Sequence, residues 1–244
     1  MKNKKLDVLI PLAGKSSFFD DNSYIYPKPL IEVNNVPMIQ LVLERLISMG
    51  IVDKFIFIVN SDDCKKYHLD NVLKLLTNEK CEIIKLDKDT KGAVCSALMA
   101  IDSIDSEKEL LICNGDQIID EDHNDIVDFF RINKYDAGVV TFNSVHPRWS
   151  YVRLNDQNNI IETTEKRPIS DSAISGFYYF NKASYFIQSS MKMIEKDANV
   201  NGLYYVAPTL NELVLENKKL GVYNISNDKY HSFYSPQKIK VYES

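Results

Sequence analysis

Several features that would point to other classes of protein are missing from this sequence of 244 residues. There is no basic tract and the net charge is −5, so we do not expect general nucleic-acid binding, because phosphate affinity requires a clustered basic face. The apolar run near the start is interrupted by Asp7 and Pro11 and is too short for an export signal or a membrane span. We therefore expect a cytoplasmic protein that does not enter membranes.

The four cysteines and four histidines show no spacing typical of a metal site or a disulfide. No CxxC pair occurs, and no histidines form a metal-ligand pair at helical spacing. Cys95 and Cys113 lie inside apolar runs, so we expect them to be buried free thiols. There is also no linker rich in proline, glycine or serine, and no repeat, so we expect one continuous domain over residues 1–244.

Strand and helix patterns alternate over the first 142 residues. Runs rich in valine, isoleucine and leucine are separated by segments in which apolar residues recur at helical spacing. The expected strands are 6–12, 54–60, 81–86, 109–116 and 136–142, and the expected helices are 38–50, 61–77 (with Ser61 as N-cap), 91–101 and 123–134. This alternation predicts βαβ units and a three-layer α/β fold, in which a mostly parallel sheet is flanked by helices.

The pattern changes after residue 142. Three closely spaced strands are expected at 150–156, 158–166 and 174–180, followed by helices near 183–195 and 208–217 and a short strand at 220–225. Short spacing with turn residues between strands is typical of hairpins. We therefore expect a late antiparallel β region within the same domain.

Polar groups follow the ends of the predicted parallel strands, where an open α/β sheet binds its ligand. Ala13 and Gly14 follow the first strand and would let a ligand approach the backbone N–H groups, although an ordinary tight turn is the alternative. Asn114 and Asp116 follow the fourth strand. A carboxylate there can hold a divalent cation against phosphate oxygens, and a loop acid or helix cap is the alternative.

Two further segments carry charges in a defined setting. Lys28 stands between Pro27 and Pro29, whose fixed φ angles make a rigid frame for aiming a positive charge at phosphate. The alternative is a solvated loop lysine. Glu165 and Lys166 lie in the predicted late β region, where a solvated strand end is the simpler interpretation.

Taken together, these segments resemble the sugar-1-phosphate nucleotidyltransferases, or nucleotide-sugar pyrophosphorylases. The motifs that carry the resemblance are "LIPLAG…YPKPLIEVNNVPMIQLVLERL", "TKGAVCSAL", "ICNGDQIID", "WSYVRLNDQNNIIETTEKRPIS" and "ISGFYYF". The resemblance extends from about Leu6 to about Pro236 and is strongest to the short branch found in bacterial capsular polysaccharide loci. The PKPL block and the later E-K-x-P block, in this order, are its specific part.

The resemblance implies a glycosyltransferase-A-like, Rossmann-like fold that uses Mg²⁺. It implies a reaction in which a nucleoside triphosphate and a sugar 1-phosphate, or a similar phosphorylated small molecule, are joined with release of pyrophosphate. The nucleotide-binding part would be about residues 1–142 and the acceptor-binding part about 143–244. The product would be an activated precursor for capsular or surface polysaccharide, and a homo-oligomer is one alternative for the assembly.

The resemblance also implies roles for single residues. Leu12, Ala13 and Gly14 would border the nucleoside and its phosphates, Lys28 would steady the α-phosphate, and Gly92 would open a helix near the base. Asp116 would be the metal carboxylate with Asn114 beside it, Glu165 and Lys166 would face the sugar hydroxyls and the sugar phosphate, and Gly176 would keep the sugar pocket open. The implied catalytic residues are Lys28, Asp116 and Lys166.

Two positions depart from the family pattern. The loop usually has a second glycine and then an arginine that grips the triphosphate, but this chain has Ser16, Ser17 and Phe18 there. Phenylalanine cannot neutralise phosphate, and Lys15 would substitute only as a point charge. Near the end, Ser232 or a neighbour occupies the place of a second metal-binding aspartate, and Asp228 lies upstream.

Asp87 lies five residues before Gly92, where related enzymes often have a base-reading side chain. A carboxylate there could accept hydrogen bonds from the amino edge of guanine or cytosine, although an exposed loop acid is the alternative.

The late aromatic residues could line the bottom of a sugar site, but β-propensity favours core positions for most of them. They are Trp149, Tyr151, Phe177, Tyr178, Tyr179, Tyr204 and Tyr205.

Three functions are weighed. An active nucleotidyltransferase is preferred, because Lys28, Asp116, Glu165 and Lys166 are all kept, from three distant segments. A nucleotide-sugar-dependent glycosyltransferase of the same fold commonly has an Asp-x-Asp metal motif, which residues 116–118 do not match. A non-catalytic nucleotide-binding relative would be consistent with the two departures in the loop and near the end.

Overall fold

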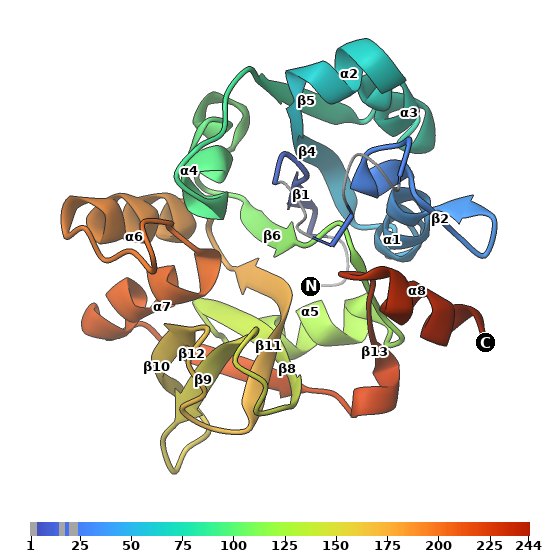
Figure 1. Cartoon of the computed structure of the whole chain (residues 1–244). Helices are drawn as coiled ribbons and strands as arrows, with labels where there is room; N and C mark the ends of the chain where they lie inside the picture. Colours follow the sequence, from blue (N-terminus) through green and yellow to red (C-terminus); the bar gives the residue numbers. More distant parts are fainter. Residues whose placement is uncertain (1–3, 15–17, 20–23) are drawn as a thin grey trace.

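A nine-stranded sheet runs through the molecule, with helices on both of its faces (Figure 1). The computed structural model describes residues 4–14, 18–19 and 24–244. Within the sheet the strand order is β10-β9-β11-β6-β1-β4-β5, with β8 pairing β11 and β12 pairing β8. The strands of this sheet are β1 (Leu6–Pro11), β4 (Val52–Asn60), β5 (Cys81–Leu86), β6 (Glu109–Cys113), β8 (Ala137–Asn143), β9 (Ser150–Leu154), β10 (Ile160–Glu165), β11 (Ser172–Phe180) and β12 (Leu220–Asn224).

The helices and the two small sheets complete the described fold. The α-helices are α1 (Met38–Ile47), α2 (Ser61–Tyr67), α3 (Leu69–Leu76), α4 (Ala93–Leu98), α5 (His123–Ile132), α6 (Ala183–Glu195), α7 (Val206–Leu215) and α8 (Pro236–Glu243). Short 3-10 turns are η1 (Lys28–Leu30), η2 (Ile101–Ser103) and η3 (Asn227–Lys229). Outside the main sheet, β2 (Glu32–Val33) pairs β3 (Val36–Pro37), and β7 (Gln117–Ile119) pairs β13 (Tyr230–Ser232).

The strand directions confirm the predicted α/β class. β1 pairs β4 and β6 in parallel, and β4 pairs β5 in parallel. β11 is antiparallel to β6, β8 and β9, and β10 is antiparallel to β9. Only β10 and β11 therefore run against the other strands of the sheet, and the antiparallel part is formed by the later half of the chain, as predicted.

β11 takes a place in the sheet that the sequence pattern does not specify. It lies between β6 and β8, the strands formed by residues 109–113 and 137–143. All residues of β11 after Ser172 are buried. A strand that is apolar on both faces is most stable inside the sheet, and periodicity alone does not reveal which neighbour it takes.

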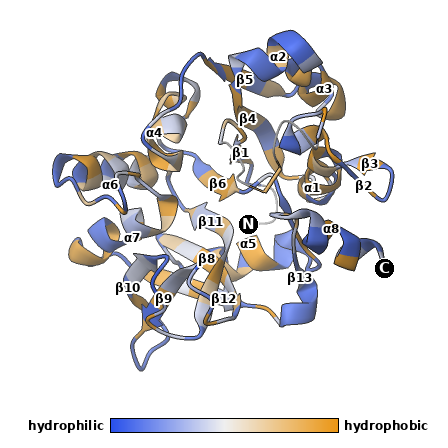
Figure 2. Cartoon of the chain, in the orientation of Figure 1, coloured by the Kyte–Doolittle hydropathy of each residue, from blue (hydrophilic) through white to orange (hydrophobic). Residues whose placement is uncertain are grey.

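The side chains of β1 point alternately to the two faces of the sheet, and they belong to two separate layers of the core. Leu6, Val8 and Ile10 pack with α1, α3 and α5, whereas Leu9 packs with α4, α6 and α7 on the other face. This is the two-residue period of a strand with both faces covered. In Figure 2 the helices carry bands of both colours, and the loop between β9 and β10 is mostly hydrophilic.

The second predicted helix, residues 61–77, is two helices in the structure. It breaks into α2 and α3 at His68, which takes a left-handed φ of 54° and gives its carbonyl to the N–H groups of Asn71 and Val72. The N-cap of α2 is Asn60, whose side chain accepts a hydrogen bond from the N–H of Asp62 at 2.8 Å, rather than the predicted Ser61. Asparagine and serine cap helices about equally well, so sequence alone does not decide between neighbours.

A third apolar cluster joins the two ends of the described chain. Buried residues of the early segment, α1, β7 and α8 pack together with the residue that follows β13, and α8 lies beside α1 in Figure 1. The cluster contains Phe19, Ile31, Val33, Met38, Ile118, Phe233 and Ile239. The proposed division at about residue 142 stays a prediction, because the later part shares both this cluster and the main sheet with the earlier part.

Two simpler expectations concern membranes and thiols. None of the helices in the described ranges has the length and apolar character needed to span a membrane. All four cysteines are free thiols; Cys113 is buried as predicted, whereas Cys95 is only partly buried. Burial raises the pKa of the Cys113 thiol, which keeps it protonated and unreactive.

Candidate active site

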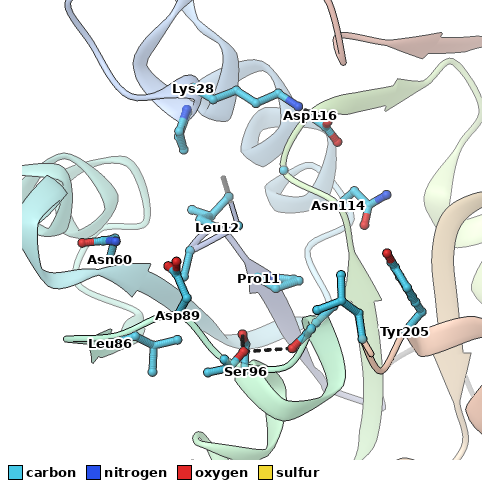
Figure 3. A pocket seen from close by; sticks show the side chains of 18 of the residues that line it. Pro11, Leu12, Lys28, Asn60, Leu86, Asp89, Ser96, Asn114, Asp116 and Tyr205 are labelled. Carbon is cyan, nitrogen blue, oxygen red and sulfur yellow. Dashed lines mark hydrogen bonds and ion pairs between the residues drawn. The ribbon is translucent and has the colours of Figure 1, made fainter. Parts of the chain in front are cut away.

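A cavity of about 730 Å³ lies at the carboxyl ends of β1, β4, β5 and β6 (Figure 3). This is where an open α/β sheet is expected to bind its ligand. Its walls come from five segments of the chain: residues 11–14, 28–29, 86–93, 114–116 and 203–205 each contribute lining residues, together with Asn60 and Ser96. Leu12, Ala13, Gly14, Lys28, Gly92, Asn114 and Asp116 are therefore brought to one site.

Lys28 and Asp116 meet at this cavity. Lys28 opens the 3-10 turn η1, which is fixed by Pro27 (φ −63°) and by the hydrogen bond from the Leu30 N–H to the Pro27 carbonyl at 2.8 Å. Its Nζ donates to a carboxylate oxygen of Asp116, and both side chains are about a quarter exposed or less toward the cavity, at 20% and 26%. The lysine Nζ also lies 5.6 Å from the ring centroid of Phe19, which lies in the third cluster. The pair is thus held by packed surroundings.

Backbone hydrogen bonds fix the segment from which Asp116 extends into the cavity. Its carbonyl accepts a hydrogen bond from the Phe233 N–H at 2.8 Å, so the β7–β13 ribbon fixes the segment that follows β6. On the other side, Asn114 donates its N–H to the carbonyl of Gly176 at 3.2 Å. Asp116 therefore projects from a backbone held by two distant parts of the chain.

Gly176 leaves room for Asn114. The glycine has a φ of 90°, and a Cβ there would lie 2.2 Å from Asn114 Nδ2 and 2.8 Å from Gln117 Oε1. Only glycine suits this conformation and this close approach. The space at Gly176 therefore serves the asparagine beside Asp116 directly.

Gly92 has a similar role at the opposite wall. It has a φ of 104°, and a Cβ there would lie 2.5 Å from the carbonyl oxygen of Tyr204. The Tyr204 N–H donates to the Lys91 carbonyl at 2.8 Å, which joins this turn to the loop carrying Leu203 and Tyr205. Beside it the hydroxyls of Thr90 and Ser96 lie 2.6 Å apart, as drawn in Figure 3.

Glu165 and Lys166 lie at the end of β10 and are not among the residues that line the cavity. Lys166 reaches it through Tyr205: its Nζ donates to the Tyr205 hydroxyl at 2.6 Å, and Tyr205 lines the cavity. Glu165 accepts a hydrogen bond from the Ser150 hydroxyl. Burial raises the pKa of the Glu165 carboxyl, while the Ser150 hydrogen bond and the Lys166 charge oppose that rise.

Two nucleotide-side residues are placed differently from the rest. Asp87 is exposed and is not among the lining residues, whereas Leu86, Lys88 and Asp89 are. Its role in reading the base stays a prediction that the cavity does not favour. Lys15 lies outside the described residues. The loop position of the missing arginine, Phe18, is 52% exposed.

The position at which the family pattern has a second metal-binding aspartate lies at the β7–β13 ribbon. Ser232 pairs Gln117, the residue after Asp116, whereas Asp228 lies in η3, beyond the far end of that ribbon. Within residues 4–14, 18–19 and 24–244, no group of three or more His, Cys, Asp or Glu side chains could hold a metal ion. The carboxylates that line the cavity are those of Asp89 and Asp116, so a metal held by Asp116 would also need oxygens from a substrate.

Several residues of the site were not identified from sequence. Thr90, Ser96 and Ser150 had no assigned role, and Tyr205 was one of the aromatic residues that could lie at a sugar site, most of which were expected in the core. Most of that aromatic group is indeed buried: Tyr151, Phe177, Tyr178, Tyr179 and Tyr204 are each less than a tenth exposed. The adjacent pair Tyr204–Tyr205 could have been separated only by knowing which ring faces the core.

Comparison with known proteins agrees with this geometry. Residues 14–223 match the family model described as nucleotidyl transferase. The chain is 26% identical over 222 residues to the bifunctional protein GlmU of Methanococcus aeolicus, covering 89% of this chain and 49% of that protein. It thus spans about half the length of the curated relatives it matches.

Solved structures share the fold. A nucleoside-diphosphate-sugar pyrophosphorylase from Vibrio cholerae superposes with a TM-score of 0.83 at 20% identity, covering 97% of this chain and 99% of that one. An inositol-1-phosphate CTP transferase from T. maritima superposes with a TM-score of 0.75 at 15% identity, covering 98% and 94%. With the match to most of the chain, these findings confirm the resemblance seen in the sequence, and the chain belongs to the nucleotidyl transferase family of enzymes.

Proposed function

We propose that this enzyme transfers a nucleotidyl group from a nucleoside triphosphate to a sugar 1-phosphate, or a similar phosphorylated small molecule, and releases pyrophosphate. The observation that carries the proposal is the meeting of Lys28 and Asp116 in the cavity at the strand ends. Phosphoryl-type displacement needs positioning and charge neutralisation more than a nucleophilic side chain. A fixed ammonium beside a carboxylate supplies both.

In this proposal Lys28 holds the α-phosphate while the acceptor phosphate approaches in line. Two anions must come together for the reaction, so a positive charge between them lowers the barrier. The rigid η1 turn keeps the ammonium in place without reorganisation. The small residues Ala13 and Gly14 line the cavity, so the nucleotide can approach the backbone there.

The residues fit a magnesium ion that is held partly by substrate. Mg²⁺ usually takes one or two carboxylates together with phosphate oxygens and water, and Asp116 offers one carboxylate next to Asn114. When bound, the ion would neutralise charge on the phosphates. Asp116 would hold the ion, and the Lys28 ammonium would bind phosphate.

The acceptor side is formed by Glu165, Lys166 and Tyr205. The Glu165 carboxylate, once ionised, can accept hydrogen bonds from sugar hydroxyls, and Lys166 is linked to the cavity wall by Tyr205. The structural neighbour from V. cholerae is described as a nucleoside-diphosphate-sugar pyrophosphorylase and the one from T. maritima acts on an inositol phosphate. We therefore keep the acceptor class as phosphorylated, sugar-like small molecules.

The resemblance to capsular-locus enzymes supports a role in making an activated precursor for surface polysaccharide. We place this reaction in the cytoplasm, where nucleoside triphosphates are available. A glycosyltransferase using a nucleotide-sugar is disfavoured, because residues 117 and 118, after Asp116, are a buried glutamine and a buried isoleucine and add no second carboxylate.

The test is a matrix of four nucleoside triphosphates against a panel of phosphorylated sugars and polyols, read by pyrophosphate release with Mg²⁺. We expect release that depends on both substrates. Transfer or hydrolysis of a nucleotide-sugar without pyrophosphate would support the glycosyltransferase instead. Tight triphosphate binding with no turnover across the panel would support the non-catalytic relative.

A further inference from the structure

The cavity has few positive charges for a ligand as anionic as a triphosphate. Among the described residues that line it, only Lys28 and Lys88 carry a positive side chain, and Lys28 is paired with Asp116. The loop position at which relatives have a gripping arginine is Phe18. The described part of the site therefore lacks a guanidinium, the group best suited to bind phosphate oxygens in pairs.

An arginine from a different part of the chain lies next to Phe18. The Arg148 guanidinium carbon, from the turn before β9, lies 5.7 Å from the centroid of the Phe18 ring. It lies 5.1 Å from the Trp149 ring and 3.0 Å from the Tyr234 ring. Phe18 and Tyr234 contact each other edge to face with centroids 5.6 Å apart. Three aromatic rings thus hold one guanidinium.

Stacking on rings leaves the donors of Arg148 available. Rings cover the faces of a guanidinium, whereas its five N–H groups point outward in its plane. Each of the other arginines is paired with a carboxylate: Arg45 with Asp120, Arg131 with Glu109, and both Arg153 and Arg167 with Glu162. Within the described part of the chain, Arg148 has no such carboxylate partner. It is positioned without being neutralised.

Arg148 is also on the side of the site that carries Asp116. Tyr234 follows Phe233, whose N–H donates to the Asp116 carbonyl. The partly buried Tyr230 hydroxyl is within electrostatic reach of both charges: loss of solvent around it chiefly raises its pKa, Asp116 raises it further, and Arg148 lowers it. Arg148 borders a second cavity of about 630 Å³, together with Tyr230, Ser232 and Tyr234. Ser232, which borders this second cavity, pairs Gln117, the residue after Asp116, and Asp116 lines the first cavity.

We propose that Arg148 supplies, from the turn before β9, the guanidinium that the loop lacks at Phe18, and that it binds the β- and γ-phosphates of the triphosphate. Phe18 then has a function of its own: it is one wall of the ring cage that orients the arginine. The positive charge would then come from the turn before β9 instead of from the loop, but it would still lie next to residue 18. This inference rests on the proposed function, since it assigns a substrate contact of that reaction.

The test compares Arg148→Ala, Arg148→Lys and Phe18→Arg/Arg148→Ala with the unchanged enzyme. The matched control is Arg153→Ala on β9, whose side chain is half exposed and paired with Glu162. We expect Arg148→Ala to raise KM for the triphosphate and to lower kcat/KM roughly 10- to 100-fold, the effect of losing a charged hydrogen bond. KM for the acceptor should stay the same. Lysine should restore little and the double variant should recover part of the loss.

A binding measurement separates this inference from the proposed function. Equilibrium affinities of the unchanged enzyme and Arg148→Ala are measured for each of the four nucleoside triphosphates and the matching monophosphates, with Mg²⁺. We expect the variant to bind triphosphate more weakly and monophosphate equally well, whether or not an acceptor for turnover has been found. Equal triphosphate affinity would overturn the role of Arg148. A rise in acceptor KM alone would also overturn it, and would assign Arg148 to the acceptor phosphate in the second cavity.

Discussion

Among single residues, Ser150 modifies the ionisation of Glu165, which burial chiefly determines. Burial raises the pKa of this carboxyl above its ordinary value of 4.5, and the hydrogen bond from Ser150 limits the rise. If ionised Glu165 binds the acceptor hydroxyls, activity falls as the pH drops through this raised pKa. The environment of Glu165 should therefore be visible in a pH profile.

Ser150→Ala is expected to move the acidic limb of the kcat/KM profile to higher pH. The substitution removes a donor that favours the carboxylate, so the pKa of Glu165 rises further. The profile is measured for the acceptor under saturating triphosphate, with Ser106→Ala, at an exposed serine, as control. An unchanged acidic limb in Ser150→Ala would show that Glu165 does not govern binding.

Whether the sequence predicts a residue of the site depends on how far along the chain its contacts lie. Lys28 and Asp116 were predicted from a rigid turn and a strand end, which are local features, and the structure brings them together. The contacts of Lys166 with Tyr205 and of Arg148 with Phe18 and Tyr234 join segments far apart. No local pattern marks such pairs, so they were not predicted.

At the scale of elements, β11 depends on a glycine in its middle. Gly176→Ala is expected to destabilise the protein by about 1–3 kcal/mol from backbone strain at φ 90°, with a further loss from the clash with Asn114. Activity should fall as well, because Asn114 lies beside Asp116. Denaturant unfolding and kcat measure the two effects.

Gly202→Ala is the control that separates strain from contact. Gly202 has a φ of 77°, but a Cβ there would meet nothing within 4 Å. The excess loss in Gly176→Ala over Gly202→Ala is the cost of displacing Asn114. Equal losses, with activity retained, would show that the close approach at Gly176 contributes nothing to the site.

The elements themselves were largely predictable, because hydrophobic period is a local signal. The strands β1, β4, β5 and β6 and their helices lie close to the predicted ranges. The position of β11 between β6 and β8 was not predictable, since it is a choice among neighbours. The ribbon of β7 and β13 was missed because each strand has three residues and gains its partner from the other half of the chain.

At the scale of the whole molecule, a buried ion pair ties α5 to the sheet. Arg131 on α5 donates to both oxygens of Glu109 on β6, and the Tyr179 hydroxyl of β11 donates to the same carboxylate at 3.0 Å. Glu109 is 1% exposed. The Lys4 ammonium also lies 3.1 Å from Glu109, but its side chain is half exposed. Removing Arg131 therefore leaves the buried Glu109 carboxylate with only a solvent-exposed counter-ion.

Arg131→Ala is therefore expected to lower the free energy of unfolding by about 3–5 kcal/mol. The comparison is Arg45→Ala, whose pair with Asp120 is largely exposed and should contribute about 0–1 kcal/mol. Both are measured by urea unfolding at pH 7. A loss in Arg131→Ala no larger than in Arg45→Ala would contradict the importance of this network.

The third apolar cluster explains why the site needs the whole chain. It joins Phe19, before Lys28, to Phe233 and Ile239 near the end of the chain, and the Phe233 N–H donates to the Asp116 carbonyl. We propose that this pair, which the packing of distant segments brings together, performs nucleotidyl transfer.

The most direct test is kcat for pyrophosphate release in Lys28→Ala and Asp116→Ala, with the best triphosphate and acceptor and with Mg²⁺. Lys54→Ala is the control, because its partner Glu82 lies on β5 away from the cavity lining. We expect a loss of about 100-fold or more in each site variant, a near-normal rate in the control, and unfolding transitions that show all three proteins to be folded. A near-normal rate in either Lys28→Ala or Asp116→Ala would contradict the proposed role of the pair.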